Sequence, residues 1–222
     1  MRRTILTFVA LMLTASAMFA ETTYNNVALA SGAIGPFGRP DTTTYGETFL
    51  APNTDTILNN FSLFLNGGTT GQVQGYIASW TGANAGNLLY SSSLETVTGA
   101  AQEFDFDTGA LDLVAGDSYV AFLSIDGSEY YSYSGNTTMP GVWGNDTVPG
   151  GSFVYLNNST SPSQFTTFPW NSAGGSFTAE FTANFDAGSN ADPSTATPEP
   201  SSLILFGTGL AGFVSALRRK RV

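Results

Sequence analysis

The sequence contains neither cysteine nor histidine. Without cysteine no disulfide framework can form, so the stability of the chain must come from a packed core. The two absences also exclude Ser-His-Asp and Cys-His nucleophile systems and every zinc or copper site with His or Cys ligands. These exclusions disfavour catalysis, and we expect a protein that is not an enzyme.

Positive charge is also scarce, and almost all of it lies at the two ends of the chain. Between residues 21 and 197, Arg39 is the only cationic residue, against sixteen acidic ones, which gives this region a net charge of −15. Binding of a polyanion depends on counterion release to Lys and Arg. The composition therefore excludes nucleic acid and anionic lipid headgroups as partners, and it leaves divalent cations.

Residues 1–20 predict a secretory signal peptide. Two arginines precede an apolar run at Ile5–Leu13, and small residues follow, with Ala17 and Ala20 as alternative cleavage positions. The competing interpretation is a short N-terminal anchor, but the apolar run is too short to cross about 30 Å of hydrocarbon.

A second apolar segment lies near the other end. Residues 188–197 are small, polar and proline-containing, which predicts a flexible linker. Ser201–Leu217 carries no charge and would rise about 26 Å as a helix, close to the lower limit for a bilayer. The basic residues that follow would stay in the cytoplasm and leave the acidic region outside.

This C-terminal arrangement resembles a known sorting signal over residues 198–222. A Pro-Glu-Pro sequence, a short apolar helix and a basic terminus occur in the order of the PEP-CTERM signal of Gram-negative bacteria. The matching residues are Pro198, Glu199, Pro200, Arg218, Arg219, Lys220 and Arg221. The resemblance implies transient anchoring in the inner membrane with the body in the periplasm, recognition by the membrane protease exosortase, and release to the cell surface or extracellular matrix. The alternative is a plain tail anchor.

Residues 21–187 predict one all-β domain, an antiparallel two-sheet sandwich of the jelly-roll type. Period-two alternation recurs between turn residues, most clearly at Ser176–Phe185, where alternate Phe and Ala side chains share one face. The other predicted strands are Tyr45–Leu50, Ile57–Leu65, Gln72–Trp80, Leu88–Ser92, Gln102–Phe106, Ser118–Ile125, Glu129–Ser134 and Ser152–Leu156. Stretches such as ILNNFSLFLN and LVAGDSYVAFLS resemble non-catalytic carbohydrate-binding jelly-roll modules, which implies this fold and favours glycan binding.

Aromatic side chains are the candidate ligand-binding residues. A flat ring can pack against the apolar face of a sugar, and indoles in loops rich in Gly, Pro and Asn are suited to this role. The candidates are Trp80, Trp143, Trp170, Tyr131 and Tyr133. The competing interpretation for each Trp is that it fills the rim of the sandwich core.

Acidic residues are the candidate metal ligands. Glu103, Asp105 and Asp107 alternate along one strand, about 7 Å apart on the same face, which suits Ca²⁺ or a solvated surface. The turn residues Asp117, Asp126 and Glu129 are similar candidates. We expect no cofactor other than a structural calcium ion.

Three functions remain open. The first is a non-catalytic binding or adhesion module for extracellular polysaccharide. The second is a structural matrix or surface protein without a discrete ligand. The third is a glycan-acting hydrolase, which is disfavoured because the acidic residues lie in polar turns or on wet faces, with no sign of a pair tuned by burial.

Overall fold

The computed structural model describes residues 21–39, 42–68, 70–125, 137–144, 147–157, 162–173 and 177–188. The predicted signal peptide, nearly all of the linker and the sorting segment lie outside these residues. Within the described ranges, no helix has both the length and the apolar character that crossing a membrane requires.

The described elements are almost all strands. In chain order they are β1 (Thr22–Asn25), the 3-10 turn η1 (Val27–Leu29), β2 (Gly32–Ile34), β3 (Thr42–Leu50), β4 (Ile57–Leu65), β5 (Thr70–Trp80), β6 (Ala85–Thr98), β7 (Gln102–Asp112), β8 (Ser118–Ser124), β9 (Met139–Trp143), β10 (Ser152–Asn157), the helix α2 (Pro162–Thr167), β11 (Asn171–Ser172), β12 (Phe177–Ala179) and β13 (Phe181–Asp186).

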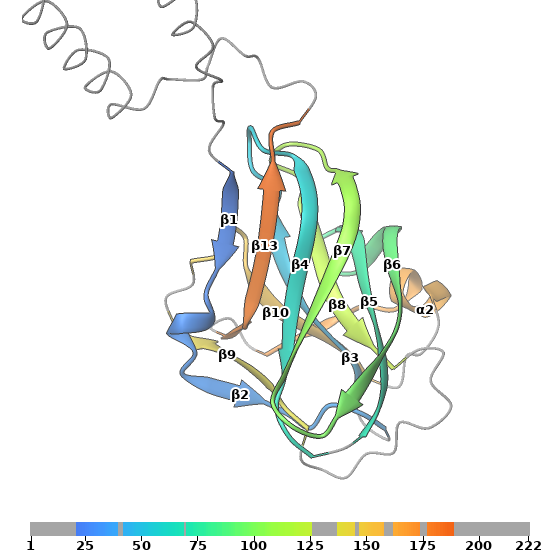
Figure 1. The fold of residues 1–222 in the computed structure, drawn as a ribbon. Helices are drawn as coiled ribbons and strands as arrows, with labels where there is room; N and C mark the ends of the chain where they lie inside the picture. Colours follow the sequence, from blue (N-terminus) through green and yellow to red (C-terminus); the bar gives the residue numbers. More distant parts are fainter. Residues whose placement is uncertain are drawn as a thin grey trace, which may run out of the picture. The chain divides into compact units, whose positions relative to one another are not determined.

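Two antiparallel sheets form a sandwich, which confirms the predicted fold class. One sheet has the strand order β1-β13-β4-β7, and the other has the order β11-β10-β3-β8-β5-β6. Figure 1 shows the four-stranded sheet in front of the six-stranded one. The chain passes between these two sheets four times from β3 to β8, namely from β3 to β4, from β4 to β5, from β6 to β7 and from β7 to β8. Strands that pair within a sheet are therefore often far apart in the sequence.

Phenylalanine rings fill the space between the two sheets. Phe61 of β4 and Phe106 of β7 lie 5.0 Å apart, and Phe49 of β3 stacks on Phe181 of β13 at 5.5 Å. All four side chains are buried, and full burial of such a ring stabilises a fold by about 1.5–3 kcal/mol. Gly75 of β5 makes room for this packing, because a Cβ there would lie 2.6 Å from the Phe106 ring.

A third sheet, with the order β12-β9-β2, is formed by short strands. It corrects the prediction of one continuous strand at Ser176–Phe185. The chain leaves strand geometry at Glu180, so that β12 pairs with β9 while β13 pairs with β4. The predicted face is nevertheless confirmed, since Phe177, Ala179, Phe181, Ala183 and Phe185 are all buried.

The other predicted strands differ from the structure mainly in length. The prediction for β4 matches at both ends, whereas β3, β6 and β7 are longer than the alternation suggested. β6 curves beside β5 through several irregularities in register, which hide its periodicity. The predicted strand Glu129–Ser134 lies outside the described residues.

The six-stranded sheet is covered on both faces. Its inner face packs against the four-stranded sheet, and part of its outer face packs against α2 and the residues after it. Phe165 of α2 contacts the rings of Phe122 and Tyr76 at 5.0 and 5.3 Å. Burial on two sides explains why β8 is an almost continuous apolar run rather than an alternating one. It also places the segment that follows α2 on the outer face, where a candidate site lies.

Candidate functional site

Trp80 and Trp170, both predicted as ligand-binding residues, meet on the outer face of the six-stranded sheet. Their ring centroids are 5.7 Å apart and the ring planes are at 85°, an edge-to-face arrangement. Both indoles line a pocket of about 460 Å³. The other lining residues are Thr48, Gly82, Ser118, Gly150, Ser152, Val154, Asn171 and Ser172. We call these ten residues the Trp80–Trp170 pocket.

Trp170 is the fixed member of this pair. Its side chain is 9% exposed, and its indole packs edge-on against Phe122 of β8 at 5.1 Å. The ring nitrogen donates a hydrogen bond to the carbonyl of Phe165 at 2.9 Å, and the backbone N–H donates to Ala83 at the same distance. This indole is therefore part of the packing beneath α2, and it reaches the pocket from a rigid position.

Trp80 is the more accessible member, because it ends β5 and is only half-buried. A tight turn follows it, in which the Thr81 hydroxyl donates to the carbonyl of Asn84 at 2.9 Å and accepts from the Asn84 N–H at 3.0 Å. Gly82 in this turn has a φ of +92°, a conformation that favours glycine. The turn therefore holds Trp80 at the edge of the pocket without covering it.

The other described residues of the pocket wall are Gly82, Gly150, Val154 and five small polar residues, and none of them is charged. The Thr48 hydroxyl donates to the carbonyl of Gly150 at 2.8 Å. The side chains of Ser118, Ser152, Asn171 and Ser172 make no hydrogen bond to any other described residue. These side chains are consequently available to a polar ligand.

Trp143, the third predicted tryptophan, lies elsewhere. It ends β9 in the three-stranded sheet, where its ring packs against Phe177 at 4.9 Å and leaves half of the side chain exposed. Gly32 of the neighbouring β2 lies directly beneath it, since a Cβ there would be 2.5 Å from the indole nitrogen. The structure therefore brings together two of the three candidate indoles. Tyr131 and Tyr133 lie outside the described residues.

The acidic residues of β7 behave as their alternation predicts. Glu103, Asp105 and Asp107 share the exposed face, with Phe104 and Phe106 buried between them. Asp105 accepts a hydrogen bond from the Ser62 hydroxyl at 3.1 Å, and Asp107 accepts one from the N–H of Gly109 at 2.8 Å.

The acidic face of β7 influences the pKa of Tyr90 in β6. Burial raises the pKa of Tyr90 in β6, and the carboxylates Asp107, Glu95 and Asp105 raise it further. Asp117 is an exposed turn residue, whereas Asp126 and Glu129 lie outside the described residues. In the part of the chain that is described, no three acidic side chains converge on a metal position. Calcium binding at these carboxylates stays a prediction.

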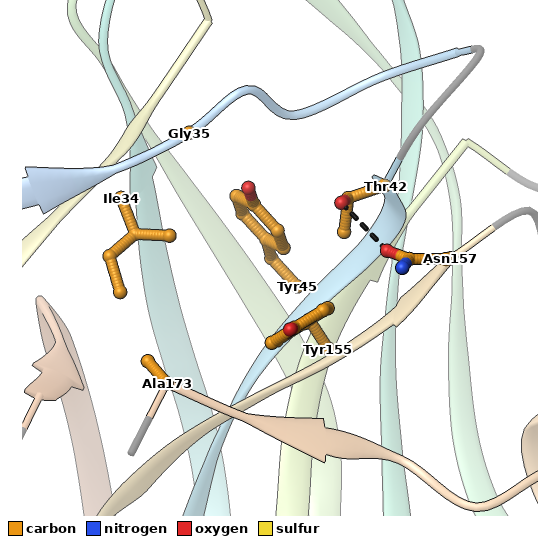
Figure 2. Close-up of a pocket in the computed structure, with 7 residues that line it drawn as sticks. All are labelled: Ile34, Gly35, Thr42, Tyr45, Tyr155, Asn157 and Ala173. Atoms are coloured by element: carbon orange, nitrogen blue, oxygen red, sulfur yellow. Dashed lines mark hydrogen bonds between the residues drawn. The ribbon is translucent and has the colours of Figure 1, made fainter. Parts of the chain in front are cut away.

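A second pocket, of about 330 Å³, was not predicted from the sequence (Figure 2). Tyr45 of β3 and Tyr155 of β10 are direct partners in the sheet, with ring centroids 6.4 Å apart. Two of its hydroxyl groups already bond to protein atoms, because the Tyr45 hydroxyl donates to the Pro36 carbonyl and the Thr42 hydroxyl donates to Asn157, both at 2.9 Å. In the sequence these tyrosines cannot be told from ordinary core aromatics.

The two pockets differ in what they offer a ligand. In the smaller pocket of Figure 2, the hydroxyls of Tyr45 and Thr42 already bond to protein atoms. The larger Trp80–Trp170 pocket presents a partly exposed indole beside four polar side chains that bond to no other described residue. Small-molecule sites combine an apolar or aromatic surface with a few convergent polar groups. The Trp80–Trp170 pocket is therefore the stronger candidate site.

Comparison with known proteins bears on the C-terminal end. The family model of the PEP-CTERM protein-sorting motif matches residues 196–220, which confirms the resemblance seen in the sequence. The match includes the Pro-Glu-Pro sequence and ends just before Arg221. A motif of this kind indicates an exported protein that is sorted through an exosortase, a membrane protease-like enzyme. No curated protein matches the chain.

Proposed function

We propose that the β-sandwich is a non-catalytic module that binds extracellular polysaccharide at the Trp80–Trp170 pocket. In this proposal the chain passes through the inner membrane with its body in the periplasm and then reaches the cell surface or extracellular matrix. The sorting motif at residues 196–220 supports the route, and the pocket supports the activity of the exported body.

The pairing of Trp80 with Trp170 is the observation that carries this proposal. Sugar rings present apolar C–H faces together with hydroxyl groups at their edges. The half-buried Trp80 indole suits the apolar face, because a flat aromatic ring offers a large contact surface with little loss of conformational entropy. The small polar side chains of the wall suit the hydroxyl groups.

The chemistry of the pocket supports binding without catalysis. Hydrolysis of a glycosidic bond by the usual mechanism needs two carboxyl groups about 5–9.5 Å apart, one on each side of the bond. Neither described pocket is lined by an Asp or a Glu. The chain also has no histidine or cysteine that could replace them.

A binding screen with matched tryptophan variants tests the proposal. The full chain, purified in a detergent without a sugar headgroup, is applied to an array of bacterial polysaccharides with calcium or with chelator. We expect a specific signal that Trp80→Ala lowers by about tenfold or more, because loss of a stacked indole costs at least about 1.4 kcal/mol. Trp143→Ala is the control, since that indole is more exposed than Trp80 but belongs to another sheet.

The alternative outcomes separate the remaining functions. A blank array from a protein whose circular dichroism shows intact strands would contradict the proposal and favour a structural matrix role. A signal that survives Trp80→Ala but disappears with Trp143→Ala would move the site to the three-stranded sheet. Release of shorter sugars from the array would instead support the alternative function of a glycan-acting hydrolase.

A further inference from the structure

We infer that the Trp80–Trp170 pocket takes an uncharged polysaccharide rather than one that carries carboxylate, sulfate or phosphate groups. This inference rests on the proposed function and narrows its ligand class. It follows from the side chains of the wall, from the charge of the body and from the position of its one cation.

None of the described residues that line the pocket is cationic. Recognition of a sugar carboxylate typically uses Arg or Lys, whose charged N–H groups form short and strong hydrogen bonds with it. The wall instead offers hydroxyl and amide side chains, from Thr48, Ser118, Ser152, Asn171 and Ser172. These groups both donate and accept, which matches sugar hydroxyls, since a hydroxyl also does both.

The charge around the pocket opposes an anionic ligand. Residues 21–197 carry a net charge of −15, and their single cation, Arg39, is not among the described residues of the pocket wall. The exposed carboxylate of Asp117 directly precedes Ser118, a wall residue. Potentials from such charges reach about 8–10 Å at moderate ionic strength. A polyanion would therefore approach the site against the field of the whole domain.

A bridging calcium ion could in principle reverse this preference by joining a protein carboxylate to a sugar carboxylate. None of the ten described residues of the wall carries a carboxylate for such a bridge. Over the described ranges of the chain, no set of three acidic side chains is close enough to hold the ion by itself. The preference for uncharged sugars should therefore persist whether calcium is present or not.

A pair of polymers that differ only in charge tests the inference. The full chain is titrated with polygalacturonate and with the same polymer after reduction of its carboxyl groups to alcohols, so that length and linkage are identical. We expect the reduced polymer to bind about tenfold or more tightly than the charged one, because like charges across an interface cost affinity. Between about 0.05 and 0.5 M NaCl, the affinity for the reduced polymer should change little.

The outcomes distinguish this inference from the proposed function. If the charged polymer binds equally or more tightly, with or without calcium, the preference is overturned while glycan binding stands. If neither these polymers nor any other polysaccharide binds the folded protein, glycan binding itself is overturned, and the preference falls with it. Loss of the reduced-polymer signal in Trp80→Ala, with retention in Trp143→Ala, assigns the preference to this pocket.

Discussion

At the scale of single residues, Asn26 joins two sheets through its side-chain amide. It is fully buried beside the break between β12 and β13. Its Nδ2 donates to the carbonyl of Ala179 at 2.9 Å, and its Oδ1 accepts from the N–H of Phe181 at 2.8 Å. The side chain thus replaces a strand neighbour for the two backbone groups on either side of Glu180.

Asn26→Ala should therefore be strongly destabilising. We expect the free energy of unfolding, measured by urea titration, to fall by about 2–4 kcal/mol, because two buried backbone groups lose their partners. The adjacent Asn25 is the matched control, since its side chain is exposed and accepts a single local bond from the N–H of Val27 at 3.0 Å. Asn25→Ala should cost about 1 kcal/mol or less, and equal losses in both variants would contradict the assigned role.

Glu180, at the same break, predicts a pH dependence of stability. Burial raises the pKa of its carboxyl group above the ordinary value. When the folded state disfavours the carboxylate, the group has a higher pKa in the folded protein than in the unfolded chain. At a pH below both values it does not affect the free energy of unfolding. As the pH rises from the unfolded pKa to the folded pKa, ionisation lowers the free energy of unfolding, and the full loss is reached above the folded pKa. The charged form of Glu180 therefore opposes folding at neutral pH.

Replacement of this group should remove that dependence. We expect Glu180→Gln to be more stable than the parent at pH 7, with a difference that shrinks as the pH falls through the raised folded pKa toward about 4.5 and is absent at lower pH. Urea titrations at a series of pH values measure it. A difference that is constant across the series, or that grows toward acid pH, would contradict the assignment.

At the scale of elements, α2 holds Trp170 against the outer face of the six-stranded sheet. Phe165 is its buried anchor, at 1% exposure, whereas Phe168 just beyond the helix is 47% exposed. Phe165→Ala should remove most of this anchorage, at a cost of about 3–5 kcal/mol if the surroundings do not collapse. Because α2 has only six residues, we expect this substitution to detach α2 locally from the sheet and not to unfold the sandwich.

Tryptophan fluorescence and glycan binding together test this prediction. Phe165→Ala should shift the emission to longer wavelength and weaken binding, while circular dichroism shows that the strands persist. Phe168→Ala is the matched control and should leave both signals near those of the parent. An unchanged emission in Phe165→Ala would show that α2 does not fix the indole.

The strands illustrate how far the sequence alone could predict this molecule. The sequence located β4 at both ends, although none of its residues is exposed and its burial does not alternate strictly. Alternation failed for β2 and β9, which are short and contain Gly or Pro, and for α2, which has too few residues for a helical period. The break at Glu180 depends on partners from three other strands, and no local pattern encodes it.

The sequence predicted the two indoles of the candidate site as single residues, but it could not predict that they lie together. Indoles beside Gly and Asn pointed to Trp80 and Trp170 as single residues. Their meeting depends on α2 folding back over a sheet whose strands come from distant parts of the chain. The same long-range arrangement leaves Trp143 on another sheet, although its sequence context looks equally favourable.

At the scale of the whole molecule, charge separates the chain into two parts with different tasks. The acidic body has a single cation, whereas four of the last five residues are basic. The positive-inside rule predicts a cytoplasmic position for such a basic end, and in the proposed route the acidic body lies outside. The sorting motif at residues 196–220 lies at the junction between the two parts.

Cleavage at this junction should depend on the Pro-Glu-Pro sequence and not on proline content alone. We expect replacement of Pro198, Glu199 and Pro200 by alanine to leave the protein at its uncleaved size in the membrane fraction, detected by immunoblotting of fractionated cells that contain an exosortase. Pro193→Ala in the adjacent linker is the matched control and should be processed normally, because it lies outside the matched residues. If the alanine variant is released like the parent, the segment acts as a plain anchor cut elsewhere. If the parent itself stays at its uncleaved size in those cells, the tail is retained, and the body acts at the membrane surface.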